Sequence, residues 1–384
     1  MAKIKSTDTH LFSALVLSGG GARAAYQVGV LKAIADIMPE GTRNPFGIIS
    51  GTSAGAINAA GLAANADNFR NAVYAMEHVW KNFRPHQVYR TDPVGVFACA
   101  GRWLASMVFS FRNRPVSMLD NTPLASLLDE MLRFNNIRDV IDAGYLRAVA
   151  ITASGYTSGQ SVAFFQGSPD ISAWKRFQRI GMRVDLKLEH LMASAAIPVV
   201  FPAVRINREY FGDGAMRQLA PISPALHLGA RKVLVVGVSG NRSAPQVRKP
   251  SEGYPSLAQI SGHLLNSVFL DSLEYDIERL QRINKTLELI PANVRDKSGS
   301  NLRPVDSLII SPTQSLDQIA AKYLHVLPPT IRVFLHGIGA TRTSGSSILS
   351  YLLFERGFCS ELIALGYHDA MAQADAIAQF MDSE

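Results

Sequence analysis

The pentapeptide Gly51-Thr52-Ser53-Ala54-Gly55 constrains the fold of this chain more than any other stretch. It follows an apolar run at 46–49 and precedes a helix-forming run to Ala64, so the predicted order is strand, sharp turn, helix. At such a turn the serine is strained, and the flanking glycines avoid collisions between strand and helix. Ser53 is therefore a candidate nucleophile at the positive end of a helix. The alternative is an ordinary turn in which Ser53 only caps the helix. We call this pentapeptide the elbow.

A glycine loop, Gly19-Gly20-Gly21-Ala22-Arg23, follows a short apolar strand at 14–17 and opens another predicted helix. The glycines leave backbone N–H groups unobstructed, and the helix dipole adds positive potential. The loop can therefore bind an oxygen anion. The side chain of Arg23 could anchor the loop or contact a phosphate.

A nucleotide phosphate is an alternative ligand for the glycine loop, because Gly19, Gly21 and Ala24 form a loose dinucleotide fingerprint. Two observations oppose it. Asp36 and Glu40 lie in or just after the predicted helix, where they cannot serve as the acidic strand-end residue of that fingerprint. The lysine of a P-loop is also missing after the glycines.

A serine nucleophile needs a base, and none of the nine histidines lies in a glycine-rich or turn context typical of a catalytic loop. The motif Gly212-Asp213-Gly214-Ala215 is a better candidate. An aspartate between glycines can approach another backbone closely and lose its water. This raises the proton affinity of the carboxylate toward that of a general base. The alternative is an ordinary Asp-Gly turn in a hairpin.

The order of these motifs resembles the patatin-like phospholipase family, in particular its bacterial members. Between the elbow and Asp213 the chain also carries Ala193-Ser194-Ala195-Ala196-Ile197-Pro198, followed by Phe201-Pro202. The resemblance covers residues 11–238 by its motifs. It implies a serine–aspartate dyad without histidine, with Ser53 as nucleophile and Asp213 as base, and it makes Gly19 to Arg23 the oxyanion hole.

The resemblance further implies hydrolysis of acyl esters through an acyl-serine intermediate, with no metal and no cofactor. We therefore expect a serine lipid acyl hydrolase of the phospholipase A or lysophospholipase type. The open alternatives are a lipid acyltransferase and a non-catalytic lipid-binding scaffold. The chain departs from the family pattern at two positions, with Ala24 and Ala215 where many members carry glycine. Both substitutions are small, so we expect the geometry to be retained.

We expect an α/β fold with a mostly parallel central sheet flanked by helices and a helical C-terminal lobe. The predicted catalytic domain covers residues 11–240. Residues 241–255, rich in Ser, Asn, Arg, Lys, Pro and Gly, form a predicted linker or mobile loop. Residues 256–384 form the predicted lobe, packed on the catalytic domain. The apolar strand expected at 305–311 is able to rejoin the main sheet.

Charge and hydropathy suggest contact with a membrane surface rather than with nucleic acid. The net charge is +7, but Lys and Arg are scattered. The stretch from Val94 to Phe111 is apolar and ends near Arg112 and Arg114, which fits either an interfacial helix or a cap helix packed on the core. The two cysteines lie far apart in sequence and no signal-peptide pattern opens the chain. We therefore expect a cytoplasmic protein, or one peripheral to the inner face of a membrane. The oligomeric state is left open.

Overall fold

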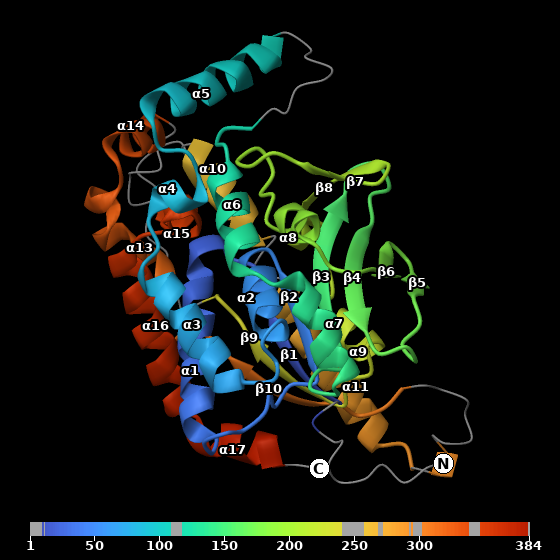
Figure 1. Cartoon of the computed structure of the whole chain (residues 1–384). Coiled ribbons are helices and arrows are strands. Elements are labelled where there is room, and N and C mark those ends of the chain that lie inside the picture. Colours follow the sequence, from blue (N-terminus) through green and yellow to red (C-terminus); the bar gives the residue numbers. More distant parts are fainter. Residues whose placement is uncertain are drawn as a thin grey trace.

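The computed structural model describes residues 10, 12–108, 117–239, 257–267, 272–291, 293–294, 302–337 and 346–382. Strands of the described residues form a ten-stranded sheet: β1 (Ser13–Leu17), β2 (Ile48–Thr52), β3 (Ala148–Gly155), β4 (Ser161–Gly167), β5 (Trp174–Arg176), β6 (Arg179–Arg183), β7 (Val204–Ile206), β8 (Glu209–Asp213), β9 (Lys232–Val236) and β10 (Asp306–Ile310). The order is β10-β9-β1-β2-β3-β4-β6-β5, with β8 paired to β3 and β7 to β8 (Figure 1).

One half of the sheet is parallel, as predicted. Strands β10, β9, β1, β2 and β3 all run in the same direction. Every residue of β1, β2 and β9 is buried, because helices cover both faces. This double burial explains why these strands read as continuous apolar or small-residue runs.

The other half holds the antiparallel pairs, although β4 and β6 run parallel. Strands β4 and β8 run antiparallel to β3, β5 runs antiparallel to β6, and β7 runs antiparallel to β8. The physical reason is the length of the connections. A two-residue turn at 207–208 joins β7 to β8, and a parallel pair would need a crossover of about a dozen residues.

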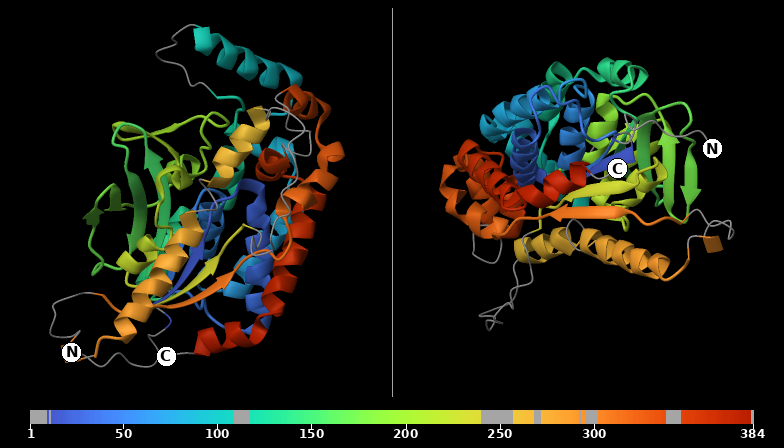
Figure 2. Two further views of the ribbon diagram at one scale, coloured as in Figure 1. Left: turned by 180° about the vertical axis from the view of Figure 1, so that it is seen from behind. Right: turned by 90° about the horizontal axis from the view of Figure 1, so that it is seen from below.

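Helices cover both faces of the sheet, which Figure 2 shows from two further directions. One face packs on α1 (Ala25–Ile37), α2 (Ala54–Ala63), α3 (Phe69–Lys81), α16 (Arg356–Met371) and α17 (Ala374–Asp382). The other packs on α9 (Ser223–His227) and α11 (Ser272–Glu288). The remaining helices include α4 (Pro85–Val88), α6 (Thr122–Met131), α7 (Phe134–Asp142), α8 (Leu188–Ser194), α10 (Leu257–Asn266), α13 (Leu316–Lys322), α14 (Pro329–Gly337) and α15 (Ser346–Leu352). The expected α/β fold with helices on both sides of a central sheet is confirmed.

Residues from the C-terminal part of the chain belong to the same layers as the rest. β10 lies beside β9 in the main sheet, and α16 packs along α1. A Cβ at Gly29 would lie 2.0 Å from the carbonyl oxygen of Ile363, and one at Gly366 would lie 2.1 Å from that of Tyr26. The two helix backbones therefore touch directly. The division of the chain at 240 and 256 stays a prediction, and its linker, 241–255, lies outside the described residues.

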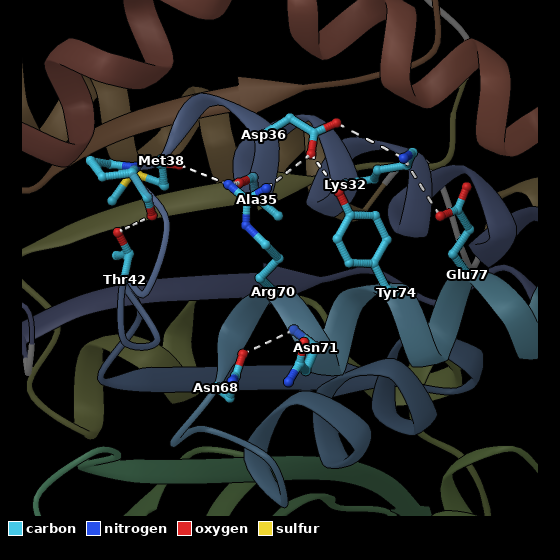
Figure 3. A network of polar contacts seen from close by, with 11 residues as sticks. Lys32, Ala35, Asp36, Met38, Thr42, Asn68, Arg70, Asn71, Tyr74 and Glu77 are labelled. Carbon is cyan, nitrogen blue, oxygen red and sulfur yellow. Dashed lines mark hydrogen bonds and ion pairs between the residues drawn. The ribbon is translucent and has the colours of Figure 1, made fainter.

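A polar network ties the end of α1 to α3 (Figure 3). Nη2 of Arg70 donates to the carbonyl oxygens of Ala35 at 2.6 Å and Met38 at 3.0 Å, which satisfies acceptors that a helix end leaves without partners. Asp36 accepts a hydrogen bond of 2.8 Å from the hydroxyl of Tyr74 and lies 3.9 Å from Nζ of Lys32. Asp36 thus has a structural role on the α1 surface, which agrees with the argument against a dinucleotide site.

The predicted helix from Val94 to Phe111 is α5 (Pro93–Val108), and Phe109 and Phe111 lie outside the described residues. Helix α5 extends away from the body, beyond the carboxyl ends of the parallel strands, with α14 beside it (Figures 1 and 2). Val94 is 78% exposed, whereas Val96 and Cys99 are buried. Among the described residues, no helix combines the length and apolar character needed to cross a membrane.

Candidate active site

The elbow forms the turn between β2 and α2. Ser53 has a φ of 56° and a ψ of −129°, a backbone conformation that residues with side chains rarely adopt. A Cβ at Gly51 would lie 2.4 Å from the carbonyl oxygen of Gly55, and one at Gly55 would lie 2.4 Å from the carbonyl oxygen of Leu17. Side chains at either glycine would force strand and helix apart, so both glycines are required for this turn.

Ser53 and Asp213 form a buried hydrogen-bonded pair. Oγ of Ser53 donates to Oδ2 of Asp213 at 2.6 Å. The other carboxylate oxygen, Oδ1, accepts the backbone N–H of Ala215 at 3.0 Å. Ser53 is 2% exposed and Asp213 is 0% exposed. Because the backbone supplies the hydrogen bond at position 215, alanine serves there without any change in this contact.

Strand β3 brings the two residues together across 160 positions of sequence. On one side β3 pairs with β2, and Thr152 lies opposite Thr52. Strand β3 also pairs with β8, and Ala153 lies opposite Asp213. The backbone N–H of Asp213 also donates to the carbonyl oxygen of Ala196 at 2.9 Å. The segment 193–198 therefore helps to hold the aspartate strand in place.

Burial raises the pKa of Asp213 from 3.8 to about 7. The hydrogen bonds from Ser53 and Ala215 act in the opposite direction, since both stabilise the charged form, but burial outweighs them. A carboxylate with this pKa can accept a proton near neutral pH, which a general base must do.

Among the described residues, the side chains that share a hydrogen bond with Ser53 are those of Asp213 and Ser194, and neither is a histidine. His190, on α8, is buried, stacks edge-on against Phe164 at 4.8 Å and accepts the backbone N–H of Lys187 at 3.0 Å. Its role is thus to cap the start of α8. No group of three His, Cys, Asp or Glu side chains in the described part of the chain could hold a metal ion.

The glycine loop lies beside Ser53, because Gly21 and Ser53 line the same pocket. Gly21 has a φ of 56°, and a Cβ there would lie 2.2 Å from the carbonyl oxygen of Tyr351. A Cβ at Gly20 would lie 2.5 Å from the side chain of Val238. The loop is therefore held between the segment after β9 and helix α15, and only glycines fit at positions 20 and 21.

Arg23 points away from the pocket and into the C-terminal helices. Its Nη2 lies 2.5 Å from Oδ1 of Asp317, and its Nε donates to Oγ of Ser350 at 2.9 Å. Of the two roles that the sequence left open for Arg23, this arrangement is that of an anchor.

A buried network of uncharged side chains around the pair was not identified from the sequence. Oγ of Ser194 accepts the backbone N–H of Ser53 at 2.9 Å and donates to the carbonyl oxygen of Thr152 at 2.6 Å. Oγ1 of Thr52 donates to Oε1 of Gln218 at 2.6 Å, and Nε2 of Gln218 donates to Oγ1 of Thr152 at 3.1 Å. The network links the strand before Ser53 to the chain after Asp213, so it constrains the separation of the pair.

A second network joins the elbow helix to the glycine-loop helix. Nδ2 of Asn58, on α2, donates to Oε1 of Gln27 at 3.0 Å, and Nε2 of Gln27 donates to the carbonyl oxygen of Ser18 at 2.8 Å. Oδ1 of Asn58 accepts the indole N–H of Trp80 at 2.9 Å. These contacts fix the two glycine-containing turns relative to each other. Their signal in sequence is weak, because Asn and Gln within alanine-rich helices have no characteristic spacing.

An apolar pocket opens beside Ser53, and its cavity volume is about 30 Å³. Its walls come from the elbow, the glycine loop, α3, α6 and the segment of the two prolines: Gly21, Ser53, Ala54, Ile57, Trp80, Phe83, Val88, Leu124, Ala195, Ile197, Phe201 and Phe354. Trp80, Phe83 and Phe354 pack on one another at centroid distances of 4.9 to 6.2 Å. Such a lining fits a hydrocarbon chain, since none of the described residues that form it is charged.

Comparison with known proteins identifies the family of this chain. The family model described as patatin-like phospholipase matches residues 15–226. The chain is 28% identical over 221 residues to the cGAMP-activated phospholipase of Pseudomonas aeruginosa (strain BWHPSA011 / Pa011), and the match covers 58% of this chain and 57% of that protein. The matched part thus spans little more than half the length of this curated relative.

Solved structures that resemble the fold of this chain include human GIVD cytosolic phospholipase A2 in complex with methyl gamma-linolenyl fluorophosphonate and terbium chloride. That likeness has a TM-score of 0.49 and 11% identity, covering 99% of this chain and 60% of the other. VipD from Legionella pneumophila is similar with a TM-score of 0.32 and 13% identity, covering 95% and 67%. On the family match, which spans more than half of its residues, the chain belongs to the patatin-like phospholipase family.

Proposed function

We propose that this protein is a serine lipid acyl hydrolase that cleaves carboxylic ester bonds of phospholipids, as a phospholipase A or lysophospholipase. The observation that carries the proposal is the 2.6 Å hydrogen bond from Ser53 to the buried carboxylate of Asp213. The apolar pocket beside Ser53 supports an acyl substrate. Membership of the family supports the reaction class.

In the first step Oγ of Ser53 bonds to the ester carbonyl carbon while Asp213 takes its proton. The carbonyl oxygen becomes an anion, which backbone N–H groups of the glycine loop, Gly19 to Arg23, stabilise. Collapse of this intermediate breaks the bond between the carbonyl carbon and the alcohol oxygen. The proton on Asp213 passes to that oxygen, so the alcohol leaves and acyl-Ser53 remains. The alcohol is a lysophospholipid when the substrate is a diacyl phospholipid, and the fully deacylated alcohol when the substrate is a lysophospholipid.

In the second step water gives a proton to Asp213 as its oxygen bonds to the acyl carbon. The bond between that carbon and Oγ of Ser53 then breaks, and Asp213 returns the proton to Oγ. The fatty acid leaves and the dyad is restored. An alcohol in place of water would give acyl transfer instead, which keeps the acyltransferase alternative open. Incubation of the enzyme with phospholipid and a lysophospholipid acceptor separates the two, since transfer yields a new diacyl lipid and hydrolysis yields free fatty acid.

Helix α5 supports a proposal of peripheral membrane contact at the substrate side of the molecule. It projects beyond the carboxyl ends of the parallel strands, where Ser53 also lies (Figure 1). Val94 on this helix is 78% exposed, and the net charge of +7 favours anionic lipid surfaces. An acyl hydrolase that meets its substrate at a bilayer needs such a surface near its pocket.

The test is intact mass spectrometry after exposure to a long-chain fluorophosphonate. We expect one adduct on the wild type, no adduct on Ser53→Ala, and a much slower adduct on Asp213→Asn. A folded wild type that forms no adduct would contradict the hydrolase proposal and favour the lipid-binding scaffold. A rapid adduct on Asp213→Asn would instead show that another group acts as the base.

A further inference from the structure

The guanidinium of Arg23 is buried at the foot of the glycine loop, with only 3% of its side chain exposed. A buried cation is costly unless an anion and further acceptors surround it. The loop itself supplies no carboxylate, because Gly19 to Ala24 contains no acidic residue. Its counterion must therefore come from elsewhere in the chain.

The counterion comes from the C-terminal lobe. Asp317, in the first turn of α13, lies 2.5 Å from Nη2 of Arg23 and also accepts the hydroxyl of Ser350 at 2.8 Å. Ser350 in turn accepts Nε of Arg23 at 2.9 Å. Arg23, Asp317 and Ser350 thus form a closed triangle of hydrogen bonds between the glycine loop and two helices.

Two further groups complete the surroundings of Arg23. The ring of Tyr351 lies 4.1 Å from its guanidinium carbon, and Oδ1 of Asn266 accepts from its Nη2 at 3.3 Å. The hydroxyl of Tyr351 donates to the same oxygen of Asn266 at 3.0 Å. Helices α10, α13 and α15 all contribute, so one arginine ties three elements of the lobe to one loop of the site.

The contacts of Arg23 restrain the glycine loop, which is the most flexible backbone segment of the site. Three consecutive glycines have large backbone freedom, which must be removed if their N–H groups are to point at one oxygen. Arg23 lies two residues after Gly21, and its backbone N–H donates to the carbonyl oxygen of Gly20 at 3.1 Å. A displacement of the Arg23 side chain is therefore transmitted directly to the backbone of the loop.

We propose that Asp317 is a positioning residue for catalysis: through the buried guanidinium of Arg23 it holds the glycine loop in the shape that stabilises the oxyanion. The proposal rests on the proposed hydrolase function. It adds a charged residue of the C-terminal lobe to the active site, where Phe354 already lines the pocket; none of the described charged residues of the lobe lines it.

The test compares Asp317→Asn with Glu361→Gln. The control is matched, since Glu361 accepts Nζ of Lys322 at 2.8 Å at the other end of the same helix α13. For Asp317→Asn we expect kcat to fall at least about tenfold with little change in KM, as after loss of oxyanion stabilisation. Glu361→Gln should keep kcat within about twofold. Asp317→Glu keeps the counterion and should recover most of the activity.

A second readout separates positioning from a general loss of structure. A trifluoromethyl ketone lipid forms an oxyanion with the serine, whereas an unreactive ether lipid only fills the pocket. Asp317→Asn should weaken inhibition by the ketone in proportion to kcat and leave binding of the ether lipid unchanged. Equal weakening of both, or an unchanged kcat, would overturn the proposal. If Asp317→Asn does not fold, Ser350→Ala replaces it in the same assays, because Ser350 bonds to both Arg23 and Asp317. We then expect a several-fold fall in kcat, and an unchanged kcat would overturn the proposal.

Failure of the proposed function would look different. In that case the wild type itself would form no fluorophosphonate adduct and show no ester turnover. An active wild type with a fully active Asp317→Asn would overturn only the positioning role.

Discussion

Replacement of Asp213 by asparagine should abolish turnover and at the same time stabilise the folded protein at pH 8. Burial raises the pKa of this carboxyl from 3.8 to about 7, so the folded protein holds the charged form at a free-energy cost. At about 1.4 kcal/mol per pH unit, that cost approaches about 4 kcal/mol at pH 8. Asparagine has the same shape and no charge, and its side-chain oxygen can still accept the N–H of Ala215. We expect a gain of about 2–4 kcal/mol in the free energy of unfolding.

The sign of the effect depends on pH in a defined way. Between pH 3.8 and about 7 the folded wild type binds a proton at Asp213 that the unfolded chain has already released. Its stability therefore falls as the pH rises through this window, and the asparagine variant lacks this dependence. The advantage of Asp213→Asn should be near zero at pH 4 and should reach its full value above pH 7.

Urea unfolding of both proteins at pH 4.5, 6 and 8, with ester turnover measured in parallel, checks this. Ser53→Ala is the matched control. It also abolishes turnover and keeps a side chain at the same strained φ, but it removes a hydrogen bond that stabilises the charged carboxylate. Its stability at pH 8 should fall. A stability difference between Asp213→Asn and wild type that is the same at all three pH values would refute the reasoning.

Three further changes test the parts around the dyad. Ser194→Ala leaves the Ser53 N–H and the Thr152 carbonyl without their partner, so kcat should fall about tenfold or more with KM nearly unchanged in steady-state assays. Gly55→Ala drives a methyl group against the carbonyl of Leu17 and should lower the free energy of unfolding by several kcal/mol in a urea titration, about 3 or more. Val94→Asp should weaken sedimentation with anionic vesicles while hydrolysis of a soluble monomeric ester stays unchanged, if α5 contacts the bilayer.

Much of the site could be predicted because its signals are local. The positive φ of Ser53 and the close contacts at Gly51 and Gly55 all lie within one turn, and a short motif records them. Asp213 was identified for a similar reason, since glycines flank it. The assignment of these residues to catalysis stays a prediction until they are substituted.

The supporting residues could not be predicted, because their contacts span long stretches of chain. Gln218 contacts Thr52 across 166 positions, and Arg23 contacts Asp317 across 294. Ser, Thr and Gln are common on any surface, so nothing in their local sequence distinguishes a buried partner from an exposed one. The parallel half of the sheet followed from its apolar runs. Strands β5 and β6 were not predicted, because half-buried strands of three to five residues carry little periodic signal.

The cost to stability and the proposed action of Asp213 as a base have the same origin. In water a carboxylate is too weak a base to take a proton from serine, and most serine hydrolases would use a histidine to do so. Here complete burial of Asp213 removes the hydration that makes it weak, which raises its pKa and destabilises the charged fold by the same free energy. The hydrogen bonds from Ser53 and Ala215 return part of that energy, and each also lowers the basicity. A variant that gave Asp213 a third donor would therefore be more stable at pH 8 and slower at neutral pH, and the two changes should vary together across such variants.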